Sequence, residues 1–170
     1  MKSQIEQKYS IFFGNTGYDK LRELITINKY DKILIFSDFN TQENCLSHFQ
    51  DQLDIIDLQN NTEIKNKLYH YKVKPGEVSK NLDESKKIIE FLVLNGFKRN
   101  SLIINLGGGL VTDLGGFIAS IYLRGIEFVN VPTSLLGMVD ASIGGKTGVD
   151  LNNLKNIIGS FNYANLILID

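Results

Sequence analysis

The sequence offers little for disulfide, membrane or polyanion chemistry. Its one cysteine, Cys45, cannot form a disulfide within the chain, which is typical of proteins from a reducing compartment. The 18 lysines and arginines nearly balance the 19 aspartates and glutamates, so the net charge of −1 gives no general attraction for nucleic acid or anionic lipid. No apolar run is long enough to span a bilayer, and residues 1–6 lack the apolar core of a signal peptide. We therefore expect a cytoplasmic protein that binds neither nucleic acid nor a membrane.

Metal-binding side chains are also scarce. Cys45, His48 and His70 do not cluster at metal-ligand spacing, so we expect no metal site built by this chain alone. A chain of 170 residues can bury one sizeable core, which favours a single domain.

The most informative feature is a glycine turn at the end of an apolar run. Residues 102–106 predict a buried strand, and Gly107, Gly108 and Gly109 follow directly, ahead of a helix start that contains Asp113. This arrangement leaves backbone N–H groups free for a phosphate or pyrophosphate. Glycine also lets a ligand lie against the main chain and permits φ values that other residues avoid. The alternative is a tight turn without any ligand.

The surrounding segment favours a binding site over a plain turn. Residues 101–160 hold eleven of the fifteen glycines but only three basic and four acidic residues. A segment of this composition is mostly buried backbone, so we expect its few charges to serve a site rather than solubility.

Apolar periodicity predicts alternating strands and helices. Strands are predicted at residues 9–13, 32–36, 55–58, 102–106, 128–131 and 166–169. Helices are predicted at 18–27 and 42–50, and a third begins near Asn81 and stops at Gly96. Repeated strand–helix units indicate an α/β, Rossmann-like fold, a parallel sheet with flanking helices and ligand sites at the carboxyl ends of its strands. This fold would place Asp38, the glycine turn and the loop after Val131 at one edge of the sheet.

The last predicted strand stops at Asp170, and no helix pattern follows it. We therefore expect residues 1–170 to be one domain that is cut at its edge, with a following domain missing from this chain.

Two common nucleotide-binding motifs fail. In the dinucleotide pattern G-x-G-x-x-G, Thr112 stands in place of the third glycine, and the acid that should follow, Glu127, lies at the start of the next strand. The sequence Gly145-Lys146-Thr147 resembles the end of a P-loop, but Asp140 stands where that motif requires glycine. Neither an ordinary dinucleotide-binding fingerprint nor an ATPase is favoured.

Several segments taken together resemble 3-dehydroquinate synthase, the NAD-dependent shikimate-pathway enzyme that closes a seven-carbon sugar-acid phosphate into a carbocycle. The segments are residues 107–113, 122–125, 131–136, 139–148 and 155–156. The resemblance covers roughly residues 70–170 well and the earlier part more loosely. It implies an N-terminal NAD-binding domain, because the family's chain is about twice this length. It also implies a divalent metal, zinc or cobalt, held by a glutamate and two histidines in a helical second domain beyond Asp170.

The resemblance implies that NAD contacts the glycine turn and several loops. Glu77 and Lys80 resemble the residues that hold the adenosine end, and Asp38 resembles an acid near the adenine ribose, although the segment around Gly76 is also typical of a simple turn. Ser134 stands where the family has threonine and keeps the hydroxyl. The full set is Asp38, Gly76, Glu77, Lys80, Gly108, Gly109, Leu110, Val111, Thr112, Asp113, Thr133, Ser134, Lys146 and Lys155.

The resemblance also implies substrate contacts. Asp140, Lys146 and Asn156 resemble residues that contact the hydroxyls and carboxylate of the substrate. Arg124 resembles an arginine that reaches the substrate phosphate across the interface of a homodimer. Without the resemblance, Arg124 and Lys155 are typical of ordinary surface cations.

The function implied is the NAD-dependent cyclisation of 3-deoxy-D-arabino-heptulosonate 7-phosphate to 3-dehydroquinate with release of phosphate. We expect this chain alone to be inactive. Three alternatives stay open: another sugar phosphate cyclase that makes an inosose or a valiolone, a metal-dependent polyol dehydrogenase, and a nucleotide-binding module without activity.

Overall fold

The computed structural model describes residues 9–53, 67–152 and 154–170. Within them, six strands form one parallel sheet in the order β1-β8-β5-β4-β2-β3. The strands are β1 Ile11–Phe13, β2 Lys32–Asp38, β3 Leu68–Val73, β4 Ser101–Gly107, β5 Glu127–Pro132 and β8 Leu166–Ile169. The α/β, Rossmann-like fold predicted from the sequence is confirmed.

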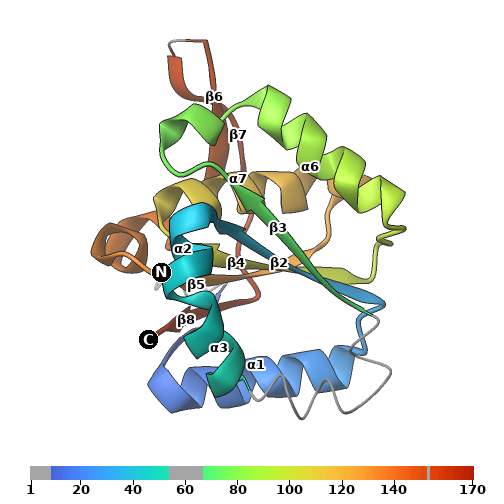
Figure 1. Ribbon diagram of the computed structural model, residues 1–170, viewed down its shortest axis with the longest axis vertical. Helices are drawn as coiled ribbons and strands as arrows, with labels where there is room; N and C mark the ends of the chain where they lie inside the picture. The colour runs from blue at the N-terminus through green and yellow to red at the C-terminus, as the bar shows by residue number, and fades with distance from the viewer. Residues whose placement is uncertain (1–8, 54–66, 153) are drawn as a thin grey trace, which may run out of the picture.

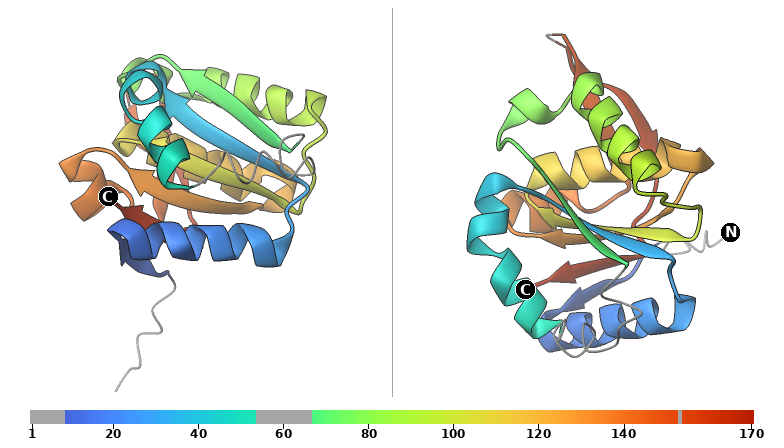
Figure 2. Two further views of the ribbon diagram at one scale, coloured as in Figure 1. Left: turned by 60° about the horizontal axis from the view of Figure 1, so that its bottom comes forward. Right: turned by 45° about the vertical axis from the view of Figure 1, so that its right-hand side comes forward.

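Helices cover both faces of this sheet, as Figure 1 and the two views of Figure 2 show. The helices are α1 Gly14–Asn28, α2 Phe39–Asn44, α3 Leu46–Gln52, α6 Leu82–Leu94 and α7 Gly109–Ile121. Side chains alternate along each strand, so β2 sends Leu34 and Phe36 into the core under α6 and α7 and Ile33 and Ile35 into the core under α1 and α3. Because both faces are covered, the central strands are apolar on both sides.

The last strand lies inside the sheet. β8 pairs with β1 and β5, and Leu168 is fully buried where α1 packs against it. The helix that covers Leu168 of β8 therefore comes from the start of the chain.

Some predicted elements differ from the structure. The helix predicted at 42–50 is two helices, α2 and α3, divided at Cys45. The strand predicted at 55–58 lies outside the described residues, and β3, which pairs with β2, was not predicted. Three shorter helical segments accompany the main helices: η1 Glu77–Ser79, η2 Tyr122–Arg124 and the π-helical η3 Gly137–Ala141.

A hairpin projects from the α7 side of the sheet (Figure 1), and the sequence did not predict it. Its strands, β6 Lys146–Leu151 and β7 Leu154–Phe161, pair antiparallel with each other. The hairpin crosses α7, and the Ser160 hydroxyl donates to the Ser120 hydroxyl of that helix at 2.8 Å. Among the described residues, no helix combines the length and the apolar character needed to cross a membrane.

Candidate functional site

The carboxyl ends of the parallel strands bring distant residues to one edge of the sheet. Asp38 at the end of β2 lies in register with Val73 of β3, and Gly107 at the end of β4 with Pro132 of β5. β2 and β4 also pair in parallel. The prediction that Asp38, the glycine turn and the loop after β5 share one edge is confirmed.

The three glycines of the turn have different structural roles. None of them has a positive φ, so the turn does not use the wider φ range that glycine permits. A Cβ on Gly107 would collide with the side chain of Val111, so this glycine is required by packing. A Cβ on Gly109 would meet only Ala141, at an ordinary 3.4 Å. Packing therefore does not require glycine at 109, and its bare backbone favours close approach of a ligand.

The N-terminus of α7 begins at this turn. Gly108 is the N-cap residue, and no side chain caps the helix. The amide nitrogens of Val111 and Thr112 donate to the carbonyl oxygen of Gly108. An uncapped helix start with two glycines presents N–H groups and the positive end of the helix dipole at the edge of the sheet.

A buried ion pair lies one turn further along α7. Lys80 Nζ and Asp113 Oδ2 are 2.5 Å apart, and the Lys80 side chain is only 5% exposed. Burial raises the pKa of the Asp113 carboxyl, the Lys80 ammonium opposes that rise, and the Glu77 and Asp140 carboxylates add to it. Three other sequence-predicted site residues, Glu77 of η1, Lys80 just after it and Asp140 of η3, thus lie within electrostatic reach of Asp113.

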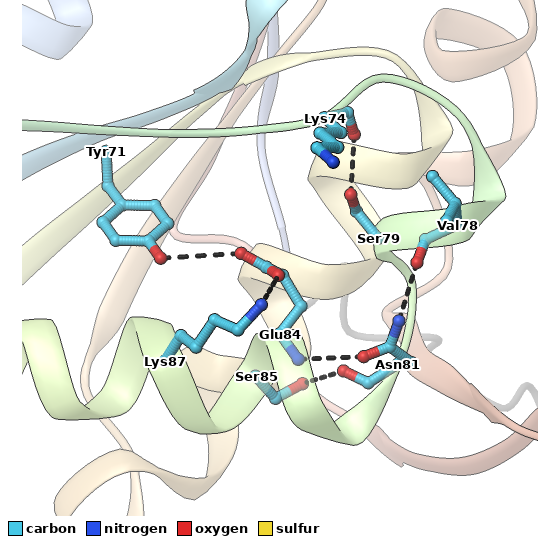
Figure 3. A network of polar contacts seen from close by, with 8 residues as sticks. All are labelled: Tyr71, Lys74, Val78, Ser79, Asn81, Glu84, Ser85 and Lys87. Atoms are coloured by element: carbon cyan, nitrogen blue, oxygen red, sulfur yellow. Dashed lines mark hydrogen bonds and ion pairs between the residues drawn. The ribbon is translucent and has the colours of Figure 1, made fainter.

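The loop that carries Lys80 is held by its own hydrogen bonds (Figure 3). The Ser79 hydroxyl donates to the Lys74 carbonyl at 2.8 Å, and the Asn81 side chain donates to the Val78 carbonyl at 2.7 Å. The Asn81 side chain also caps α6 by accepting from the Glu84 amide. Gly76 has φ 87, so the turn itself explains this glycine.

Two predicted cofactor residues also accept hydrogen bonds from nearby backbone amides. Asp38 Oδ1 accepts from the Thr41 amide at 2.8 Å at the start of α2. Ser134 Oγ accepts from the Gly137 amide at 3.2 Å. The Thr133 amide donates to the Gly107 carbonyl at 3.1 Å, which ties the loop after β5 to the glycine turn.

The hairpin brings Lys155 to the same cluster. Lys155 Nζ lies 3.8 Å from Glu77 Oε2, and the Asp150 amide donates to the Lys80 carbonyl at 2.8 Å. Lys146 lies at the other end of β6, paired with Phe161, and is exposed. Asn156 lies on β7 beside the hairpin turn.

Arg124 does not join this cluster. It lies beyond the C-terminus of α7, and the 13 residues of that helix span about 20 Å. β5 begins at Glu127 soon afterwards, so Arg124 lies at the amino end of the sheet, opposite the glycine turn. Its side chain is exposed, and its backbone has φ 67.

Sequence reasoning missed a pocket of about 200 Å³ at the carboxyl edge. Leu106 and Val131 line it from the sheet, Thr133 from the loop after β5, and Tyr18 and His48 from α1 and α3. The Tyr18 hydroxyl donates to Asp170 Oδ2 at 2.9 Å, and His48 Nε2 lies 2.8 Å from the same oxygen. No local pattern connects these residues, because they lie far apart in the sequence.

The residues that the structure describes contain no group of three or more histidine, cysteine, aspartate or glutamate side chains arranged to hold a metal ion.

The fold is that of the sugar phosphate cyclases. The structure matches 2-deoxy-scyllo-inosose synthase, solved with carbaglucose-6-phosphate, NAD+ and Co2+, with a TM-score of 0.81 and 22% identity, over 95% of this chain and 42% of that chain. It matches 2-epi-5-epi-valiolone synthase from Streptomyces hygroscopicus, solved with NAD+ and Zn2+, with a TM-score of 0.73 and 25% identity, over 100% of this chain and 45% of the other.

Within this superfamily, the chain belongs to the 3-dehydroquinate synthase family. The family model described as 3-dehydroquinate synthase N-terminal matches residues 70–170. The 3-dehydroquinate synthase of Clostridium botulinum is 40% identical over 166 residues, which are 97% of this chain and 45% of that protein. The chain thus spans less than half the length of this relative.

Proposed function

We propose that this chain is the NAD-binding part of a 3-dehydroquinate synthase, which cyclises 3-deoxy-D-arabino-heptulosonate 7-phosphate to 3-dehydroquinate and releases phosphate. The observation that carries the proposal is that the uncapped N-terminus of α7 and the buried Lys80–Asp113 ion pair lie together at the carboxyl edge of the sheet. Membership of the family and the likeness to two cyclases solved with NAD+ support it.

The residues at this edge fit a dinucleotide. The amides around Gly108 and Gly109 are free of a side-chain cap and suit the pyrophosphate, the Ser134 hydroxyl lies beside Gly108, and the Thr133 amide donates to the Gly107 carbonyl. Leu110, Val111 and Thr112 complete the first turn of the proposed NAD site. Asp38, Glu77, Lys80 and Lys155 supply polar groups for the rest of the cofactor, as the family resemblance implies. When bound, NAD would supply a transient oxidation of the substrate alcohol and a return of the hydride.

The substrate is proposed to lie between the cofactor edge and the hairpin. Asp140, Lys146 and Asn156 would orient its hydroxyls and carboxylate, and lysine and arginine would stabilise the negative charge that develops on the departing phosphate. We propose that the phosphate is reached by Arg124 from a second copy of the chain, because Arg124 lies at the opposite end of its own sheet.

Co2+ and Zn2+ occur in the related cyclase structures. The described residues of this chain offer no ligand set for such an ion. We therefore propose that the ligands of any metal come from outside them.

The test is turnover by the complete protein, including any residues that follow Asp170. Phosphate release from the heptulosonate phosphate should require NAD in catalytic amounts and should cause no net accumulation of NADH. The purified 170-residue chain alone should bind NAD weakly in a calorimetric titration and should not turn over. Turnover by the 170 residues alone would contradict the proposal that this chain supplies only the NAD-binding part of the enzyme.

The alternatives separate in the same assay. Because the fold resembles an inosose synthase and a valiolone synthase, the substrates of those two enzymes should be tested alongside the heptulosonate phosphate. Preferential phosphate release from a glucose phosphate or a non-acidic heptulose phosphate would indicate one of those cyclases. Stoichiometric NADH production from a polyol would indicate a dehydrogenase, and NAD binding without any turnover by the complete protein would indicate a binding module.

A further inference from the structure

Asp150, on β6, contacts two of the proposed functional segments. Its amide donates to the Lys80 carbonyl at 2.8 Å, and it forms a parallel bridge with Asn81. Its side chain contacts the other strand of the hairpin: Oδ1 accepts a hydrogen bond from the backbone amide of Asn156 at 2.7 Å. Asp150 thus joins the loop that carries Lys80 to the strand that carries Asn156.

The Asp150 side chain acts at an irregularity in the hairpin. Val149 pairs with Ile158 and Leu151 with Leu154, so residues 155–157 of β7 face a single residue of β6. Extra residues in a bulge lose their ladder partners. The Asp150 carboxylate takes the place of such a partner for Asn156.

Asn156 has an unusual backbone conformation at this point. Its φ of 53 is in the left-handed region, which is unfavourable for a residue with a Cβ and is tolerated best by asparagine and aspartate. An external hydrogen bond to its amide stabilises that conformation. Because the backbone conformation sets the direction of the Cα–Cβ bond, the Asp150 carboxylate also constrains where the Asn156 side chain starts.

We propose that Asp150 is a positioning residue. Its carboxylate holds the Asn156 backbone in the left-handed bulge and so orients the side-chain amide of Asn156 toward the sugar-acid phosphate. This inference rests on the function proposed above, in which Asn156 contacts the substrate. The same bulge carries Lys155, whose Nζ lies 3.8 Å from Glu77 Oε2. The connection to the cofactor loop runs mainly through the Asp150 backbone, so the side chain serves the substrate side.

The test compares Asp150 variants by steady-state kinetics in the complete protein. Asp150→Ala removes the acceptor and should raise the KM for the heptulosonate phosphate about tenfold, the effect of losing one hydrogen bond. The KM for NAD should change by less than about twofold, because the backbone contact with Lys80 stays. Asp150→Asn keeps an oxygen acceptor and should retain nearly the wild-type KM for the substrate.

A double-mutant cycle separates positioning from general damage. If Asp150 acts through Asn156, adding Asp150→Ala to Asn156→Ala should raise the substrate KM little further. Asp83→Ala removes an exposed acid near the same loop and is the matched control, with both KM values expected to stay unchanged. If Asp150→Ala does not fold, Asp150→Glu is the replacement variant. It displaces the carboxylate by one methylene and should also raise the substrate KM.

Three results would overturn the inference while leaving the proposed function intact. The first two are an active wild type whose substrate KM is insensitive to Asp150→Ala, and additive effects of the two alanine variants. Equal increases of the substrate KM in Asp150→Ala and Asp150→Asn would also overturn it, since the hydrogen-bond acceptor would then be irrelevant. An inactive wild-type protein would instead contradict the proposed function, and the inference with it.

Discussion

Lys80 and Asp113 form the most buried ion pair among the described residues at the proposed site. Their side chains are 5% and 20% exposed, whereas the pair of Lys86 and Glu90 on α6 is 74% and 57% exposed. Removing one partner of a buried pair leaves a charge without compensation, which costs far more than breaking an exposed pair.

Lys80→Met should therefore lower the free energy of unfolding by about 2–3 kcal/mol, because the Asp113 carboxylate loses its counter-charge in a mostly buried position. Chemical denaturation of the 170-residue chain measures this change. The matched control is Lys86→Met, which should leave the midpoint almost unchanged. Equal effects of the two substitutions would mean that burial of the Lys80 pair has no energetic importance.

Single residues also show how structural and proposed functional roles overlap. Sequence reasoning selected Asp38 and Ser134 by resemblance to cofactor-binding residues, and the structure shows Asp38 as a helix cap and Ser134 as the acceptor of the Gly137 amide. A cap and a ligand contact need the same polar atoms at a helix start, so residue type alone does not separate the two roles. Thr133, by contrast, contacts the glycine turn through its backbone.

At the scale of elements, α7 combines close packing with an open N-terminus. A Cβ on Gly115 would overlap the Asn105 side chain and come within 2.9 Å of Phe36 Cδ1. A Cβ on Gly109 would meet only Ala141, at 3.4 Å. The helix therefore has one glycine that the sheet requires and another that the fold leaves optional.

This difference predicts opposite results for two alanine substitutions in α7. Gly115→Ala should lower the free energy of unfolding by more than about 2 kcal/mol, because the core under the helix is already full. Gly109→Ala should leave it unchanged or raise it by up to about 1 kcal/mol, because alanine has the higher helix propensity. The same variant should weaken NAD binding about tenfold by blocking approach to the backbone.

Thermal or chemical unfolding and calorimetric titration with NAD check the two halves of this prediction. Wild-type NAD affinity in a stable Gly109→Ala chain would show that Gly109 is not part of the cofactor site. Unimpaired stability of Gly115→Ala would contradict the close packing of α7 on β4.

The elements themselves were predictable where a local pattern is strong. The buried strands β2, β4 and β5 were predicted because their apolar runs are continuous, and α6 because Asn81 starts it and Gly96 follows it. β3 was missed, since its sequence LYHYKV mixes exposed and buried positions at the edge of the sheet. The hairpin was missed because β7 is mostly exposed and its pattern is interrupted by the bulge at residues 155–157.

At the scale of the whole molecule, Arg124 is a predicted site residue that the fold places far from the glycine turn. It lies at the amino end of the sheet, about one helix length from the glycine turn. If it takes part in the reaction, it must enter the site of another copy. That requirement makes the proposed homodimer testable without a structure of the complex.

Mixing two inactive variants of the complete protein tests this arrangement. Arg124→Ala and Lys146→Ala should each abolish most phosphate release. After subunits are exchanged in an equal mixture, half of the dimers carry one variant of each kind, and each of these dimers has one intact site. Activity should then recover to about one quarter of the wild-type value. No recovery despite verified exchange would show that Arg124 acts within its own chain or not at all.

The sequence by itself determined the local features: the alternation of apolar runs and helix signals, the glycine turn, and the motif set that identifies the family. These features depend on residues within a few positions of one another, so periodicity and glycine chemistry reveal them. The tertiary structure alone decided the strand order, which inserts β8 between β5 and β1, and the contacts of Lys80 with Asp113 and of Asp150 with Lys80. Those depend on pairing and packing between segments tens of residues apart, where the free energy comes from the assembled core and no local pattern encodes the partner.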